Sequence, residues 1–216
     1  MLNVVCFDLG GVVVKTCRSW AEACERSRIP LREGVWISSA EALEARRAVV
    51  DRYQRGAMGP EDYFAGLVEA LRGLYSRHEV ERVHDAWLIE DYPEVEELVL
   101  ALDRRPDVVT ACLSNTNAAH WRRLVRRGPQ AEFPACVAIA HPLASHLLRL
   151  AKPDLAIYRA AEAELGTSPD QILLFDDTAE NVKAARNAGW RAELVDYRGD
   201  TAGQMRDLLA RHGLMP

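Results

Sequence analysis

Four short apolar segments rich in β-branched residues constrain the fold of this chain more than any other feature. Apolar runs of this length are typical of strands that a parallel sheet buries on both faces. Helical patterns lie between most of them, which indicates right-handed strand–helix–strand units. The predicted strands are residues 4–7, 108–113, 172–175 and 192–195, with 136–140 as a weaker fifth. We therefore predict an α/β fold with a doubly wound parallel sheet.

One interval departs from this alternation. Between about residues 15 and 90 the pattern is helical, and it contains no convincing strand. Four helices are predicted there, over residues 20–27, 39–54, 60–71 and 78–87. The expected organisation is a Rossmann-like core formed by 1–14 and 91–216, with 15–90 inserted after the first strand as a helical cap. A cap above the carboxyl ends of parallel strands encloses the place where α/β proteins bind ligands.

Charge and composition limit the classes of partner. The 216 residues carry a formal net charge of -5, which provides no general attraction to nucleic acid or to an anionic membrane. Four arginines at residues 122, 123, 126 and 127 could suggest nucleic acid, but no aromatic platform accompanies them, so a solvated helix face is expected. Recognition of an anion must therefore come from a local site, and that favours a small anionic ligand.

The cysteines and the N-terminal segment bear on location. The five cysteines include no C-x-x-C pair, which is consistent with a reducing compartment. The first residues lack the basic region of a secretory signal, and no apolar stretch is long enough to span a bilayer. We expect a soluble cytoplasmic protein with no membrane partner.

Acidic side chains follow two of the predicted strands. Asp8 ends the first strand and precedes Gly10 and Gly11, which allow a tight turn. Asp176 and Asp177 follow the predicted strand 172–175 directly. Adjacent carboxylates repel each other unless a cation compensates them. An all-oxygen site of this kind suits Mg²⁺. Each segment alone is also compatible with a turn or helix cap.

Groups suited to phosphate follow the second strand and precede a predicted helix. Ser114 and Asn115 end an apolar strand at a helix start, where a hydroxyl and free backbone N–H groups can hold phosphate oxygens. Lys152 stands immediately before Pro153, and its ammonium could neutralise phosphate and carboxylate charge. The alternatives are a helix N-cap for Ser114 or Asn115 and an exposed surface position for Lys152.

Together, and in this order, the four segments resemble the four motifs of the haloacid dehalogenase superfamily. Asp8 matches the nucleophile, Ser114 the hydroxyl residue, Lys152 the lysine, and Asp176 with Asp177 the acidic pair. The helical insert falls where this superfamily often places its cap. FDLGGVVV, LSNTN, AKPDLAIY and FDDTAENV resemble the branch that contains sugar-phosphate phosphatases and the phosphatase domain of soluble epoxide hydrolase.

The resemblance implies a mechanism and a cofactor. Asp8 would attack phosphorus in line and form an aspartyl-phosphate, which water then hydrolyses. Mg²⁺ would be bound by the carboxylate of Asp8, the backbone carbonyl of Gly10 and the carboxylate of Asp176, with Asp177 holding a metal-bound water.

The remaining matched residues would bind the substrate. Ser114, the backbone N–H of Asn115 and Lys152 would hold the phosphoryl oxygens. The implied substrate is a small phosphorylated metabolite, such as a sugar phosphate, and the implied activity is that of a phosphoric monoester hydrolase.

One position departs from the resemblance. Phosphatases of this superfamily carry a second aspartate two residues after the nucleophile, where it protonates the leaving group; here the residue is Gly10. General acid–base assistance contributes about 10²–10⁴ in rate. Two alternatives therefore stay open: a 2-haloacid dehalogenase, which needs neither that acid nor magnesium, and a catalytically decayed protein that only binds phosphate.

Several other residues draw attention without matching a motif. His141 and His146 precede Lys152, but their spacing fits no compact zinc site, so we assign them structural roles. Lys15, Arg18 and Trp20 follow the first motif at the start of the cap, and contact with substrate is expected from this position alone.

Overall fold

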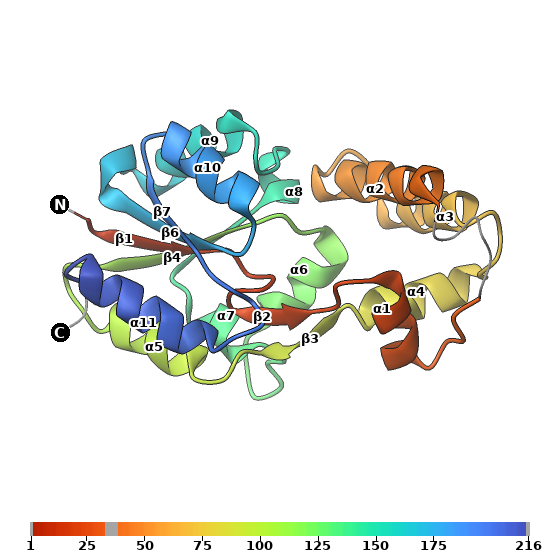
Figure 1. The fold of residues 1–216 in the computed structure, drawn as a ribbon, viewed down its shortest axis with the longest axis horizontal. Helices are drawn as coiled ribbons and strands as arrows, with labels where there is room; N and C mark the ends of the chain where they lie inside the picture. The colour runs from red at the N-terminus through yellow and green to blue at the C-terminus, as the bar shows by residue number, and fades with distance from the viewer. Residues whose placement is uncertain (1, 33–38, 215–216) are drawn as a thin grey trace.

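The computed structural model describes residues 2–32 and 39–214, and it divides into an α/β core and a helical cap (Figure 1). The core contains a five-stranded parallel sheet, which confirms the predicted fold class. In spatial order the strands are β5 (His141–Ala144), β4 (Val109–Ser114), β1 (Val4–Phe7), β6 (Ile172–Asp176) and β7 (Arg191–Leu194).

The central strand β1 is buried along its whole length. It pairs with β4 on one side and β6 on the other, so that Phe7 lies between Cys112 and Phe175. The pairing continues past the strand end, where the backbone N–H of Asp8 donates to the carbonyl of Phe175 at 2.8 Å. The residues that follow β1, β4 and β6 therefore meet at one edge of the sheet.

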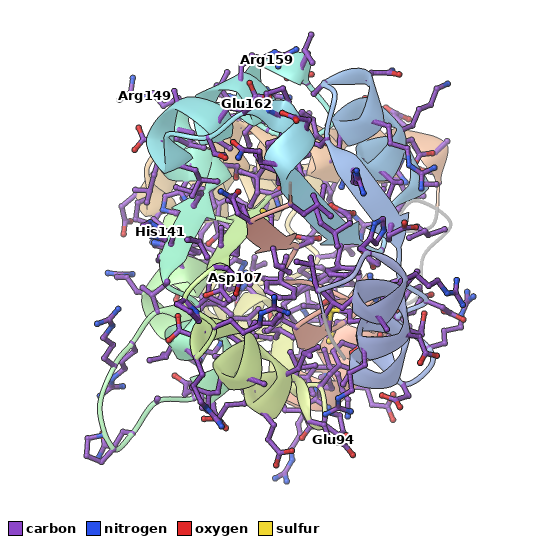
Figure 2. The ribbon with its side chains drawn as sticks, turned by 90° about the vertical axis from the view of Figure 1, so that its left-hand side faces the viewer. Glu94, Asp107, His141, Arg149, Arg159 and Glu162 are labelled. Carbon is purple, nitrogen blue, oxygen red and sulfur yellow. The ribbon has the colours of Figure 1, made fainter. Side chains whose placement is uncertain are left out.

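Alternate residues of β1 enter two separate hydrophobic clusters. Val5 and Phe7 pack with α5 (Val95–Asp103) and α11 (Thr201–Arg211), whereas Val4 and Cys6 pack with α9 (Leu155–Leu165) and α10 (Ala179–Asn187). Figure 1 shows these helix pairs on opposite faces of the sheet. In Figure 2, viewed from the end away from the cap, Arg159 and Glu162 of α9 lie on the opposite side from Glu94, which precedes α5.

The cap has a hydrophobic core of its own. Tyr53 stacks on Tyr63 with ring centroids 4.1 Å apart, and Leu71 and Val80 are buried beside them. Three of its four helices begin at a serine whose side chain accepts a backbone hydrogen bond, which satisfies a donor that the helix itself leaves free. The cap helices are α1 (Trp20–Ser27), α2 (Ala40–Gln54), α3 (Pro60–Ala70) and α4 (Arg77–Asp85).

Two strands join the cap to the core, so the prediction of no strand between residues 15 and 90 is wrong. They are β2 (Val14–Thr16) and β3 (Leu88–Asp91), which pair as an antiparallel ribbon. Both are short and partly exposed, so they carry neither a long apolar run nor a clear alternation.

The weaker fifth strand is misplaced in the prediction. Most of 136–140 lies in α7 (Pro134–Ala138), and Pro134 occupies a position at the start of a helix that needs no N–H donor. The actual strand β5 follows at the edge of the sheet and contains Pro142, which an edge strand tolerates. The remaining elements are α6 (Ala118–Leu124), α8 (Ser145–Leu148) and the 3-10 helix η1 (Pro169–Gln171). No helix in the described ranges is long and apolar enough to cross a membrane.

Candidate functional site

Three carboxylates converge at the carboxyl edge of the sheet. Asp8 follows β1, Asp176 ends β6, and Asp177 comes next in the chain. One oxygen from each of the three lies within 4.8 Å of the others. The Asp176 side chain is completely buried and that of Asp8 is nearly so. Their negative charge therefore requires compensation close at hand.

Lys152 supplies part of this compensation. Its buried Nζ lies 3.0 Å from Oδ1 of Asp8 and 2.7 Å from Oδ2 of Asp176. Lys152 is thus buried, and the alternative of an exposed surface position is wrong. Its backbone is fixed by the side chain of Asn115, whose Nδ2 donates to the Lys152 carbonyl and whose Oδ1 accepts from the Lys152 N–H, both at 2.8 Å. This positioning role of the Asn115 side chain was not predicted.

Burial and charge act against each other on these groups. Burial raises the pKa of Asp8 to about 7, although Lys152 lowers it, and Asp176 and Asp177 add to the rise. Burial alone would lower the pKa of Lys152, but Asp176 and Asp8 raise it above its ordinary value. Lys152 therefore stays a cation between the carboxyl groups of Asp8 and Asp176.

Asp176 has partners besides Lys152. The side-chain amide of Asn181, in the first turn of α10, donates to both carboxylate oxygens at 3.0 and 3.2 Å. The backbone N–H of Thr178 donates to Oδ1 at 2.9 Å. Asn181 itself is oriented by Tyr158, whose hydroxyl donates to the Asn181 carbonyl. Sequence reasoning missed Asn181; the available signal was an amide on the inward face of an amphipathic helix next to the acidic pair.

Asp177 has a different partner. Nη1 of Arg18 donates to its Oδ2 at 2.8 Å, and the Thr178 hydroxyl donates to Oδ1 at 3.3 Å. Thr178 is the N-cap residue of α10, so the capping alternative does not describe Asp177. Arg18 therefore lies beside the acidic pair, and its contact with substrate stays a prediction.

The helix-cap alternative also fails for the second motif. Asn117 caps α6, and its side chain accepts from the N–H groups of Ala119 and His120. Ser114 is the buried last residue of β4, and Asn115 lies between the strand and the cap. Asn115 therefore bonds to the backbone of Lys152, and Ser114 precedes it at the end of β4.

The two glycines after Asp8 differ in their surroundings. Gly11 has φ +88°, and a Cβ there would lie 2.2 Å from Oδ2 of Asp177, so only glycine fits without displacement. Gly10 has no positive φ, and a Cβ there would make ordinary contacts, at 3.6 Å or more, with the side chain of Thr16. The absence of a side chain at Gly10 is thus not imposed by the backbone.

The cap covers this loop with the end of α2. The side-chain Nε2 of Gln54 donates to the backbone carbonyl of Asn115 at 3.4 Å. The backbone carbonyl of Gln54 accepts from the hydroxyl of Ser145 at 2.6 Å. Arg55 donates to Asp154, near Lys152, at 2.7 Å. Nothing in the cap sequence identified Gln54 or Arg55, because their partners lie far away in the chain.

The other residues singled out from the sequence lie away from the carboxylates. Lys15 pairs with Glu90, and Trp20 packs on Tyr75 inside the cap. His141 is exposed on β5, and the ring of His146 packs against that of Trp121. Among the arginines of the proposed solvated face, Arg123 pairs with Glu132.

Comparisons with known proteins show which proteins this chain is similar to. Phosphatase MT3486 from Mycobacterium tuberculosis (strain CDC 1551 / Oshkosh) is 30% identical over 218 residues, covering 96% of this chain and 94% of the relative. The HAD family enzyme bt-2542 from Bacteroides thetaiotaomicron, solved with magnesium and inorganic phosphate, has a TM-score of 0.75 and 21% identity, covering 95% of this chain and 100% of that one.

A third similar protein represents the alternative chemistry. The L-2-haloacid dehalogenase from Xanthobacter autotrophicus, with chloropropionic acid covalently bound, has a TM-score of 0.65 and 20% identity, covering 100% of this chain and 85% of that one. At these identities both solved structures support the fold alone. The sequence itself matches the family described as haloacid dehalogenase-like hydrolase over residues 2–189. This chain belongs to the haloacid dehalogenase-like hydrolase family.

Proposed function

We propose that this hydrolase is a magnesium-dependent phosphatase of a small phosphate monoester, such as a sugar phosphate. One observation carries the proposal: Asp8, Asp176, Asp177 and Lys152 meet at the carboxyl edge of the sheet, where Ser114 ends the strand next to β1. A nucleophile, a cation site and donors for phosphoryl oxygens are thereby brought together. The likeness to Phosphatase MT3486 supports the same reaction class.

The donor set fits Mg²⁺. Three carboxylates offer oxygen atoms that lie within 4.8 Å of one another, and Mg²⁺ prefers oxygen ligands of this kind. Asp8, the carbonyl of Gly10 and Asp176 would hold the metal, with Asp177 acting through a water. When bound, Mg²⁺ supplies positive charge that offsets the carboxylates and stabilises charge developing on phosphoryl oxygens.

The protein's own residues divide the remaining work. Asp8 attacks phosphorus as the bond to the leaving oxygen breaks, and water then cleaves the resulting aspartyl-phosphate. Lys152, 3.0 Å from Asp8, favours the ionised form that attacks and faces the same space as the phosphoryl group. Ser114 and the N–H of Asn115 orient the phosphoryl oxygens, and the Asn115 side chain holds Lys152 in place.

The leaving group determines which esters suit this site. No carboxylic acid at Gly10 is available to protonate the departing oxygen. Esters with a less basic leaving group, such as anomeric, acyl or aryl phosphates, lose less from this absence than simple alkyl phosphates. We therefore expect a preference for such esters.

The test is phosphate release from a panel of phosphorylated metabolites, with Mg²⁺ or with a chelator. Mg²⁺-dependent release from at least one sugar phosphate by the wild-type protein, and none by Asp8→Asn, would support the proposal. Release that persists in the chelator would contradict it.

The dehalogenase alternative rests on Gly10, since that reaction needs no second acid. In that reaction Asp8 would attack carbon and displace halide. The acidic pair Asp176 and Asp177 is better explained by a metal, which is why we prefer the phosphatase. Halide release from 2-chloropropionate in the presence of a chelator would reverse this preference. Absence of beryllofluoride binding at Asp8 would instead indicate a decayed phosphate-binding protein.

A further inference from the structure

Asp177 is paired with a cation that belongs to the connection between core and cap. Arg18 lies between β2 and α1, where the chain passes from the core into the cap (Figure 1). Its Nη1 lies 2.8 Å from Oδ2 of Asp177, whose side chain is only 6% exposed, whereas that of Arg18 is 36% exposed. A nearly buried carboxylate of the catalytic cluster thus has a partly exposed arginine as its counter-ion.

The guanidinium of Arg18 is held by more than this ion pair. Its central carbon lies 3.8 Å from the ring centroid of Tyr197, a close stacking contact. The backbone N–H of Arg18 donates to Glu22 at 2.7 Å, which fixes the start of α1. Arg18 also lines a cavity of about 570 Å³ together with Tyr92 and Tyr197.

Arg18 also lies against the catalytic turn. A Cβ built on Gly11 would fall 2.2 Å from Oδ2 of Asp177 and 2.3 Å from Nη2 of Arg18. The turn after Asp8, the acidic pair and this guanidinium therefore share one small volume. A divalent cation held by Asp8 and Asp176, with Asp177 acting through a water, would lie close to the positive charge of Arg18.

We propose that Arg18 is the resident counter-cation of Asp177 and competes with Mg²⁺ for it, so that Arg18 sets the metal affinity of the site. This inference rests on the proposed function, because it takes Asp177 to serve the metal. Two like charges near one carboxylate weaken each other's binding, and this coupling is reciprocal.

The signature is a pair of opposite effects. Replacing Arg18 with glutamine leaves Asp177 nearly buried without its counter-ion, so the metal-free protein should melt at a lower temperature. The same change removes a competing charge, so Mg²⁺ should bind more tightly. A residue that merely supports the structure of the site would weaken Mg²⁺ binding when it is removed.

The experiment is calorimetric titration of Mg²⁺ into the metal-free, full-length protein. We expect Arg18→Gln to bind Mg²⁺ about fivefold or more tightly than wild type. Arg198→Gln is the matched control, because Arg198 stacks on the same Tyr197 ring, at 4.9 Å, and makes no described contact with Asp177. Its Mg²⁺ affinity should stay within about twofold of wild type.

The same substitution made in an Asp177→Asn variant tests whether Arg18 acts on Mg²⁺ binding through Asp177. In Asp177→Asn, Arg18→Gln should no longer tighten Mg²⁺ binding, because the shared carboxylate is gone. Unchanged or weaker binding by Arg18→Gln, or an equal gain in both backgrounds, overturns the inference. If wild type binds Mg²⁺ but hydrolyses no phosphate ester, the proposed function fails while the Arg18 result still stands or falls by the titration. If neither protein binds Mg²⁺, both proposals fail.

Discussion

The core site and the cap interior are stabilised in different ways. In the core, each buried carboxylate has a specific polar partner: Lys152 reaches Asp8 and Asp176, and Arg18 reaches Asp177. The cap interior instead contains aliphatic side chains and stacked rings such as that of Tyr53. Apolar packing accepts many sequences of suitable volume, whereas buried charges require partners of fixed identity and geometry.

This difference explains why the reaction is easier to infer than the substrate. The charged residues of the core form motifs that stand out in the sequence, while the cap presents patterns that indicate only packing. It also predicts that substitutions in the two regions separate chemistry from stability. The four predictions below test this separation, from the largest expected effect to the smallest.

Asp8→Asn should lower phosphatase turnover by more than about 10³-fold, because an amide is a poor nucleophile of nearly the same shape. The melting temperature and circular dichroism spectrum should stay close to those of wild type. Turnover of p-nitrophenyl phosphate at saturating Mg²⁺ is the measurement. Near-wild-type turnover would remove Asp8 from the mechanism.

Leu71→Ala should destabilise the protein by about 2–5 kcal/mol, since Leu71 is completely buried in the cap core and its loss leaves a cavity. Urea denaturation measures the change. Leu74→Ala is the control, because Leu74 is 37% exposed and should cost less than about 0.5 kcal/mol. If Leu71→Ala also weakens Mg²⁺ binding under native conditions, the cap and the core site are not separable as we describe.

Gly10→Asp should raise the rate with glycerol phosphate by about 10² and change that with p-nitrophenyl phosphate much less, because it supplies the missing acid. The backbone permits it: Gly10 has no positive φ, and a Cβ would meet only the Thr16 side chain at ordinary distances. Gly10→Asn has nearly the same shape but no acid and should not narrow the difference between the substrates. Equal behaviour of the two variants would show that another residue supplies the proton.

The smallest expected effect concerns the contact between the cap and the core. His84 of α4 stacks on His120 of α6 with ring centroids 3.9 Å apart, and Nε2 of His120 lies 3.0 Å from the His84 carbonyl. Burial lowers the pKa of His120 to about 4 and that of His84 well below its ordinary value. Below about pH 6.5 the unfolded chain therefore binds protons that the folded chain does not. The free energy of unfolding consequently decreases as the pH is lowered.

Each such histidine contributes a slope of about 1.4 kcal/mol per pH unit between its two pKa values. His120→Gln removes one of these two histidines. As the pH is lowered from 6.5 to 5, the amount by which the variant is less stable than wild type should therefore shrink by about 2 kcal/mol. Urea denaturation at several pH values measures this. His141→Gln, at an exposed position on β5, is the control and should leave the slope unchanged. If the difference in free energy of unfolding between His120→Gln and wild type does not change with pH, His120 has the same protonation state in the folded and the unfolded chain.

Much of the core could be predicted because its signals are local. The apolar segments at 4–7 and 172–175 match β1 and β6 closely, and the cap helices begin within a residue of their predicted starts. Asp8 and Asp176 each follow a buried strand, and parallel strands bring such positions together. Burial of short, continuous apolar runs determines these strands almost independently of the rest of the chain.

The missed features depend on pairing between distant parts of the chain. The β2–β3 ribbon forms only when the two ends of the cap meet, and neither strand is apolar enough to identify alone. Arg18 reaches Asp177, and Asn115 reaches the backbone of Lys152, across long sequence separations. A single sequence contains no measure of such distances, so partner identity could be seen only in the folded chain.

The β2–β3 ribbon also makes the cap an exchangeable module. The chain enters and leaves the cap through two paired strands, and Thr16 lies opposite Leu88. An insertion whose two ends are neighbours adds no length constraint to the sheet beneath it, so another cap with the same spacing between its ends can be grafted onto the same strands. If the proposed function holds, exchange of the cap would change the substrate range, while the carboxylates and Lys152 beneath it stay the same.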